Sequence, residues 1–165
     1  MKFAKAAFGA TLTALLIVGC GSDNASEQGA ASTTAAAADQ RSQDFDSHVL
    51  HFNAQPTADL QPEVAKQYGI VRSKNRAMLN ISIVKKLPGS TGQPVPGDVT
   101  ASASNLTGQL KTVSLREVKD GGAVYYIADL PVANGETLKF DILARPADYE
   151  GEAFQVSFTE TFYSD

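Results

Sequence analysis

Thiol chemistry is nearly absent from this sequence, which has one cysteine, Cys20, among 165 residues. The rest of the chain has no thiol. We therefore predict a folded part without disulfides, cysteine-ligated zinc, iron–sulfur clusters, c-type haem or a cysteine nucleophile.

Histidine is scarce as well, since His48 and His51 are the only two. A spacing of three in a strand sends their side chains to opposite faces. A shared metal ion would need a bend between them, and a zinc site would have to recruit distant carboxylates. We predict two unrelated strand histidines, no metal and no cofactor.

The chain has one long apolar run, residues 6–18, which follows the positive stretch of Met1, Lys2 and Lys5. A permanent transmembrane helix needs about 20 apolar residues. This shorter run instead has the n-region and h-region of a secretory signal. We predict a signal peptide over residues 1–19.

The end of this signal, Leu16-Ile17-Val18-Gly19-Cys20, resembles the lipobox of bacterial lipoproteins. The resemblance implies cleavage before Cys20 and diacylglycerol on its sulfur, so that lipid would tether the mature protein to a membrane. An ordinary secretory signal with an incidental cysteine is the alternative. Gly21 and Ser22, rather than Asp, follow Cys20, which favours the outer membrane, facing the periplasm.

Positive charge is in short supply, with 14 basic residues against 18 acidic ones and a net charge of −4. Loss of Lys2 and Lys5 with the signal would change this to −6. Nucleic acid is therefore not an expected partner. Residues 20–43, small and polar after Cys20, predict a flexible linker, and residues 44–165 predict a single domain.

Short segments of alternating polarity dominate the domain and are separated by Gly, Pro, Asn and Asp. We predict about seven strands, near 46–54, 77–86, 97–104, 110–119, 123–130, 137–145 and 152–163. The last is long and aromatic, which favours a central position. The fold class is an all-β, immunoglobulin-like antiparallel β-sandwich, with a small barrel as the alternative.

One helical segment is expected near 61–68, between the first two strands. Pro62 suits the first helical position and Gly69 the position after the end. Glu63 near the start and Lys66 near the end both suit the helix dipole.

This region also resembles a known family, through the runs LQPEVAKQYGI (60–70) and RSKNR (72–76). They resemble the signature block of proteobacterial exported proteins catalogued only as a domain of unknown function. Further similarities are Asn105-Leu106, Gly108-Gln109-Leu110, YYIA (125–128) and the run from Phe158 to Tyr163, and they extend the resemblance over 47–163. Glu160 departs from it, because the family more often has Gln there. The resemblance implies no activity, cofactor or partner.

Arg72, Lys74 and Arg76 form the densest basic cluster and alternate along the chain. Such a cluster suits a phosphate, a carboxylate or an anionic headgroup; pairing with the domain's own carboxylates is the alternative. Asp148, Glu150 and Glu152 could attract calcium but form no calcium-loop motif. Tyr125, Tyr126, Tyr149 and Tyr163 suit either a binding surface or cross-strand packing.

No catalytic motif stands out. The sequence has no Gly-x-Ser-x-Gly elbow, and the loop PGSTGQP lacks the Gly-Lys-Ser/Thr ending of a phosphate-binding loop. We therefore expect a non-catalytic binding or accessory module of the cell envelope, tethered through Cys20, whose partner is an envelope protein, glycan or lipid. The alternative is a hydrolase-like envelope enzyme whose site is assembled only in the fold, with His48 or His51 involved.

Overall fold

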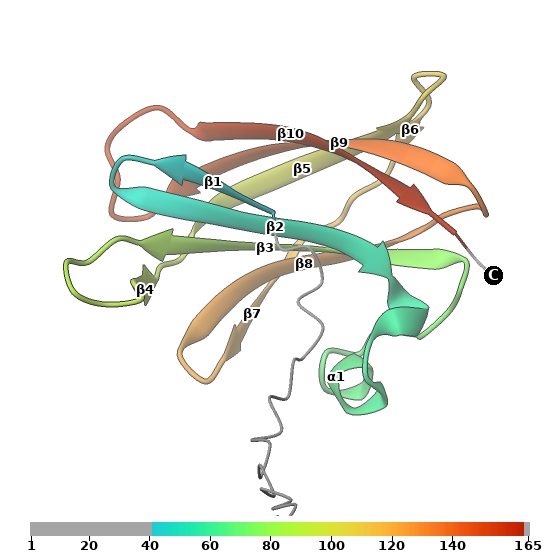
Figure 1. The fold of residues 1–165 in the computed structure, drawn as a ribbon, viewed down its shortest axis with the longest axis horizontal. Coiled ribbons are helices and arrows are strands. Elements are labelled where there is room, and N and C mark those ends of the chain that lie inside the picture. Colours follow the sequence, from blue (N-terminus) through green and yellow to red (C-terminus); the bar gives the residue numbers. More distant parts are fainter. Residues whose placement is uncertain (1–40, 164–165) are drawn as a thin grey trace, which may run out of the picture. The chain divides into compact units, whose positions relative to one another are not determined.

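The computed structural model describes residues 41–163 and shows two antiparallel sheets packed face to face (Figure 1). The six-stranded sheet runs in the order β1 (Arg41–Phe45), β2 (His48–Pro56), β3 (Arg76–Lys85), β8 (Ala123–Pro131) and β7 (Arg116–Asp120), with β4 (Gln93–Pro94) also paired to β3. The four-stranded sheet runs β10 (Phe154–Phe162), β9 (Glu136–Pro146), β5 (Gly97–Asn105) and β6 (Leu110–Lys111). The predicted β-sandwich is confirmed.

Alternation along the strands builds the core between the sheets. In β9, every second residue from Leu138 to Ala144 is fully buried, because successive side chains of a strand point to opposite faces. The ring of Phe158 in β10 lies 5.0 Å from that of Phe140 in β9 and 4.9 Å from that of Phe52 in β2. The contact between Phe158 and Phe52 joins the two sheets.

The predicted helix is present as α1 (Pro62–Gln67), after a short 3-10 turn at Thr57–Asp59. Pro62 occupies the start of the helix, and Gly69 follows its end with a φ of +62°, a conformation that glycine adopts without strain. The Ile70 amide donates to the Ala65 carbonyl at 2.8 Å and closes this end. The sequence located this element to within one residue at each end.

Two strand predictions need correction. The segment 110–119 is not one strand, because Lys111 ends β6 in the four-stranded sheet and Arg116 begins β7 in the other. Between them, Val113 and Leu115 pack against the core. The aromatic strand 152–163 appears as β10, which is an edge strand and not a central one.

Strand β1 begins at Arg41, inside the segment predicted as linker. The Arg41 guanidinium donates to the Thr159 carbonyl at 2.7 Å, pairs with Glu160 at 2.9 Å and lies 5.1 Å from the centre of the Phe158 ring. These contacts tie β1 to the edge strand of the opposite sheet. The predicted signal peptide, Cys20 and the remainder of the linker lie outside the described residues.

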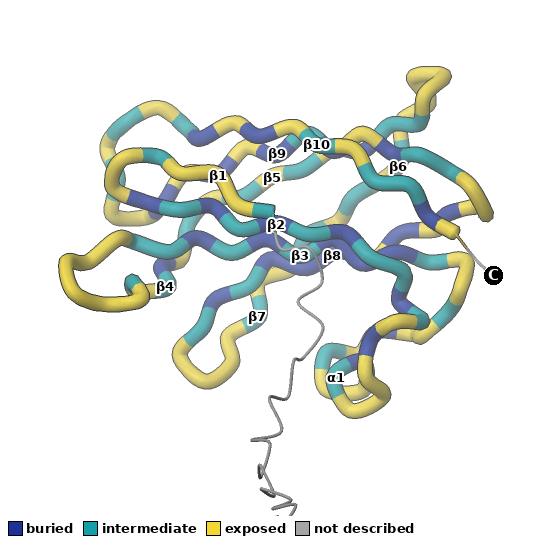
Figure 2. Tube along the Cα trace, viewed as in Figure 1, coloured by how far each residue is buried: buried dark blue, intermediate teal, exposed yellow. Residues whose placement is uncertain are grey.

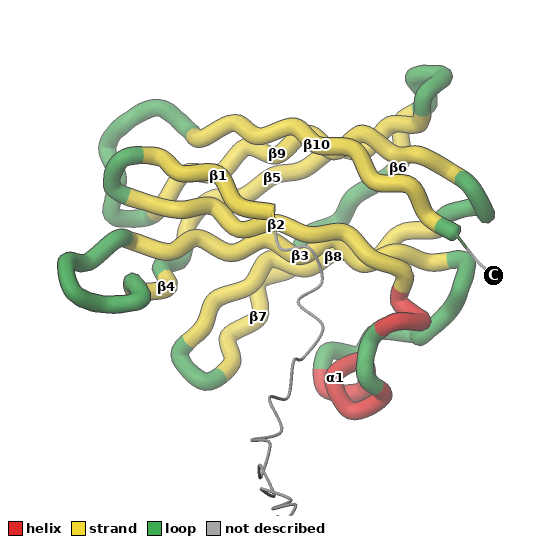
Figure 3. Tube along the Cα trace, in the orientation of Figure 1, coloured by secondary structure: helices red, strands yellow, loops and turns green. Residues whose placement is uncertain are grey.

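Helix α1 covers only part of the outer face of the six-stranded sheet (Figures 1 and 3). Beneath it is a second apolar cluster, in which Leu60, Ala65 and Ile70 pack on Met78 of β3 and Ile127 of β8. Further along the same strands, the outer face carries intermediate and exposed residues (Figure 2). The helix thus forms one boundary of an uncovered surface.

Candidate functional site

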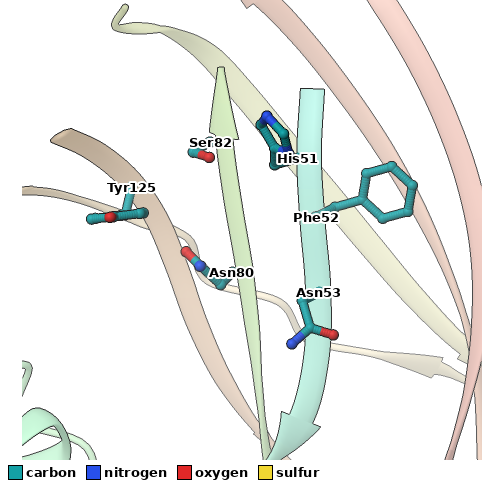
Figure 4. A pocket seen from close by; sticks show the side chains of 6 residues that line it. All are labelled: His51, Phe52, Asn53, Asn80, Ser82 and Tyr125. Atoms are coloured by element: carbon teal, nitrogen blue, oxygen red, sulfur yellow. The ribbon is translucent and has the colours of Figure 1, made fainter. Parts of the chain in front are cut away.

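The uncovered surface carries a group of uncharged polar side chains, which we call the polar patch: His51, Asn53, Asn80, Ser82 and Tyr125 (Figure 4). With Phe52, they line a cavity of about 170 Å³. The ring of Phe52 points away from the other five, towards the core (Figure 4).

Strand register brings the polar patch together. His51 pairs with Ser82 and Asn53 with Asn80 across β2 and β3. Tyr125 comes from β8, which pairs with β3 at the neighbouring positions Ile81 and Tyr126. Because the residues on either side of each patch position belong to the core, period two forces these polar side chains outward.

Asn80 has an unusual hydrogen-bonding state. Its Oδ1 is buried and is the one such side-chain atom without a hydrogen-bond partner in the described part of the chain. An unsatisfied buried acceptor costs about 1–3 kcal/mol. Its register partner Asn53 is satisfied differently, since Asn53 Nδ2 donates to Gln55 Oε1 at 3.2 Å. A donor from a bound molecule would remove the penalty at Asn80.

The chemistry of the polar patch suits recognition of a neutral polar group. Carboxamides and hydroxyls provide donors and acceptors in fixed positions, and the Tyr125 ring offers an apolar surface. The cavity is smaller than the roughly 300–1,000 Å³ typical of drug-sized ligands. It matches a single small ring or the terminal group of a larger molecule.

A second cluster of titratable groups lies where the β1–β2 turn meets the segment between β9 and β10. His48 is 2% exposed, its Nδ1 lies 2.9 Å from Ser47 Oγ, and its Nε2 lies 3.1 Å from Asp148 Oδ1. Lys85 Nζ lies 2.6 Å from Asp148 Oδ2. The hydrogen bond from Lys85, with a smaller contribution from His48, holds the pKa of the Asp148 carboxyl below its usual value.

These contacts determine which tautomer the His48 ring adopts. An ionised Asp148 can only accept, so Nε2 of His48 carries a proton; in the neutral ring, Nδ1 then accepts from the Ser47 hydroxyl. The imidazole also packs against Tyr149 and Phe154, with ring centres 5.8 Å from each. The cluster fastens the β1–β2 turn to the opposite sheet.

The two histidines do point to opposite faces, as predicted: His48 lies in the interior and His51 in the polar patch. Within residues 41–163, no group of three or more His, Cys, Asp or Glu side chains lies close enough together to hold a metal ion. None of the helices among these residues is long and apolar enough to cross a membrane.

The basic cluster does not gather around one point. Arg72 Nη2 donates to the Ala58 carbonyl at 2.6 Å, while Arg76 Nε donates to Asp129 Oδ2 at 2.9 Å. Lys74 is exposed. Arg72 and Arg76 are thus engaged by the domain's own oxygens, and an anion or partner contact by Arg72, Lys74 and Arg76 stays a prediction.

The sequence indicates His51 and Tyr125 as candidates but does not predict the polar patch. A signal was available, because the outward positions of β2 and β3 are filled by uncharged hydrogen-bonding residues in the patterns His51-x-Asn53 and Asn80-x-Ser82. Nothing local indicates that these two strands are neighbours with this register.

The domain has relatives of known structure. A DUF4426 family protein from Pseudomonas aeruginosa PAO1 is 33% identical, with a TM-score of 0.62 over 76% of this chain and 96% of that one. FetP from uropathogenic Escherichia coli strain F11 is 15% identical, with a TM-score of 0.52 over 75% of this chain and 93% of that one. A copper-bound variant of FetP is also 15% identical, with a TM-score of 0.54 over 76% and 95%. The likeness to FetP shows a shared fold.

Among curated proteins, none matches the chain. Residues 42–165 match the family DUF4426, whose description is "Domain of unknown function". This covers the region in which the sequence resembles such a family. The chain therefore belongs to the DUF4426 family.

Proposed function

We propose that this protein is a lipid-anchored, non-catalytic binding module of the cell envelope that holds a neutral polar group of its partner in the polar patch. The anchor is the lipid expected on Cys20, in the outer membrane facing the periplasm. The observation that carries the binding role is the buried, unpartnered Oδ1 of Asn80, a residue that lines an open cavity. A ligand hydroxyl or amide N–H that reaches this oxygen would donate a hydrogen bond to it and remove the cost of the unsatisfied acceptor.

The residues around the cavity favour binding over catalysis. His51 is the single imidazole among the six lining residues, and none of the six is a carboxylate, lysine or arginine. General acid–base catalysis needs a positioned group whose partner tunes its proton affinity. The polar patch offers hydrogen bonds and an aromatic surface instead.

Copper binding, which one FetP variant shows, is not part of this proposal. Copper sites in proteins use several imidazole, thiolate or thioether ligands. The polar patch has one imidazole, and both ring nitrogens of His48 are engaged by Ser47 and Asp148. The donor set of the described domain does not fit that metal.

In-cell photo-crosslinking tests the binding role. A photoreactive amino acid at Ser82, in the polar patch, is compared with the same residue at Ser102, which is exposed on β5 of the other sheet. We expect an adduct specific to position 82 that is lost when Asn80 is replaced by leucine. The same adducts at both positions would contradict the proposal. Cys20→Ser should release the protein into the aqueous fraction and abolish labelling by a palmitate analogue.

The alternative, a hydrolase-like envelope enzyme, is favoured by one observation, the hydrogen-bonded series Ser47, His48 and Asp148. Its order resembles a nucleophile, a base and an orienting carboxylate. A fluorophosphonate probe distinguishes the two functions. We expect no labelling of Ser47, and labelling that depends on His48 would replace the binding module by the enzyme.

A further inference from the structure

The β5–β6 hairpin ends in two leucines that the domain leaves in solvent. Leu106 is 78% exposed and Leu110 76%, more than any other large hydrophobic residue in the described range. The hairpin projects from the four-stranded sheet and is coloured as exposed along its tip (Figures 1 and 2).

The exposure of these leucines is built into the turn. Asn105 Oδ1 accepts from the Thr107 amide at 3.1 Å, the Thr107 hydroxyl at 2.7 Å and the Gln109 amide at 2.9 Å. The Asn105 amide donates to the Gln109 carbonyl at 3.0 Å. Gly108, with a φ of +81°, completes the turn. Two leucines are thus held outward by a fixed backbone.

The hairpin is also free of charge. From Val99 to Leu110 no residue is ionisable. The next residue, Lys111, is 19% exposed and pairs with Glu136 at 2.7 Å. A tip without charge can enter the interfacial region at lower cost than a charged one, because charged groups are the most expensive to bury in a bilayer.

We infer that this tip, residues 105–110, inserts its two leucines into the surface of the lipid bilayer to which the protein is anchored. The inference rests on the lipid anchor of the proposed function. A convex, uncharged tip with two exposed leucines suits the interfacial region of a bilayer, where no complementary groove is required. The described residues offer no other projection with two such exposed leucines.

The geometry allows this contact. Residues 20 to 41 span at most about 75 Å when fully extended. Arg41 contacts Thr159 in β10. Thr159 pairs with Lys139, Lys139 with Ser104, and Ser104 with Leu110, so Thr159 and Leu110 are three strand spacings apart, which is about 15 Å. The anchored bilayer is therefore within reach of the tip. Tethering also raises the effective concentration of lipid to about the millimolar range, so a weak insertion suffices.

A single fluorophore tests the inference, because Cys20 is the only natural cysteine and its sulfur is blocked by the thioether-linked diacylglyceryl group in the anchored protein. Thr107→Cys, labelled with nitrobenzoxadiazole, reports on the tip, and Thr91→Cys in the β3–β4 loop is the matched control. Both proteins are reconstituted, full-length and lipidated, into phosphatidylethanolamine–phosphatidylglycerol vesicles. We expect a blue-shifted emission and quenching by doxyl lipids at position 107 only. Leu106→Ser combined with Leu110→Ser should abolish both signals, while the protein stays on the vesicles through Cys20.

Water-like emission at position 107, equal to that at position 91, would overturn the inference. So would a blue shift that appears only after an envelope protein extract is added, because the tip would then bind a protein groove. To separate the tip from the anchor, a Cys20→Ser variant with a polyhistidine tag at the mature N-terminus is held on nickel-chelating lipid. A blue shift at position 107 in this protein supports tip insertion even where acylation of Cys20 fails, and its absence contradicts it.

Discussion

Replacing Asn80 by leucine should separate the stability of the domain from its binding function. Asn80 Oδ1 is buried and lacks a partner among the described residues, a state that costs about 1–3 kcal/mol. Leucine has no acceptor to satisfy, and its methyl groups can occupy part of the open cavity of about 170 Å³. We expect Asn80→Leu to raise the free energy of unfolding by about 1 kcal/mol, at the low end of that range because the amide nitrogen is lost as well.

The assay is urea unfolding followed by circular dichroism, in which the midpoint rises and the slope m stays unchanged. For a domain of this size, about 1 kcal/mol corresponds to a rise in Tm of about 3–6 °C. Asn53→Leu is the matched control. It removes the donor of a hydrogen bond to Gln55 on the same face and should be neutral or destabilising by about 0.5–1.5 kcal/mol.

Equal destabilisation by the two leucine variants would refute this reasoning, because it would show that the Asn80 oxygen is satisfied in the free protein. The patch-specific crosslink at position 82 provides the second readout. A variant that is more stable and yet has lost this adduct would show that the unsatisfied oxygen is kept for binding.

Three further predictions concern the scaffold. Phe140→Ala should lower the free energy of unfolding in urea by about 3–5 kcal/mol, because Phe140 is fully buried. Leu143→Ala, on the outer face of the same strand, should change it by at most about 0.5 kcal/mol. Similar losses in the two variants would mean that the two faces of β9 are misassigned. Asp148→Asn should flatten the acid side of the stability–pH curve. The pKa of Asp148 in the folded protein is lowered, chiefly by Lys85, so the stability that its carboxylate contributes is present above the unfolded pKa near 4 and is lost as pH falls through the folded pKa. An unchanged acid side of the curve would contradict this. Gly97→Ala should lower Tm, because the added methyl would collide with a backbone carbonyl of β9, and an unchanged Tm would show that the strands can separate without cost.

Much of the fold could be predicted because it depends on local periodicity. The strict alternation from Leu138 to Ala144 identifies β9 and its buried face, and Asn134-Gly135 identifies the turn before it. The short helix follows from Pro62 and Gly69 in the same local way.

The strand predictions that were wrong depend on which strands become neighbours in a sheet. The alternation of Val113 and Leu115 suggested one strand over residues 110–119 and does not reveal that the chain leaves one sheet at Lys111 and enters the other at Arg116. The aromatic face of β10 suggested a central strand, yet Phe158 packs on Phe52 of the opposite sheet. One-sided burial of that kind measures contact between sheets, and an edge strand has it as fully as a central one.

The polar patch was missed for the same reason. Period two correctly sends His51, Asn53, Asn80 and Ser82 outward, but their adjacency depends on the pairing of β2 with β3, which are separated by the helix and two loops. The sequence also does not show that α1 leaves these positions uncovered, because the placement of the helix on the sheet depends on tertiary packing.

The side chain of Thr57 fixes the segment that leads from α1 into β3, the strand that carries Asn80 and Ser82 of the polar patch. Thr57 is fully buried; the single proton of its hydroxyl is shared between the carbonyls of Val71 and Ser73, at 2.9 and 3.1 Å, and its oxygen accepts from the Ser73 amide at 2.9 Å. It thereby pins the segment between α1 and β3, part of the run by which the family is recognised. For the proposed binding role, β3 would thus enter the polar patch from a segment that is already ordered, so little conformational entropy would be lost on association and more of the contact energy would remain as affinity.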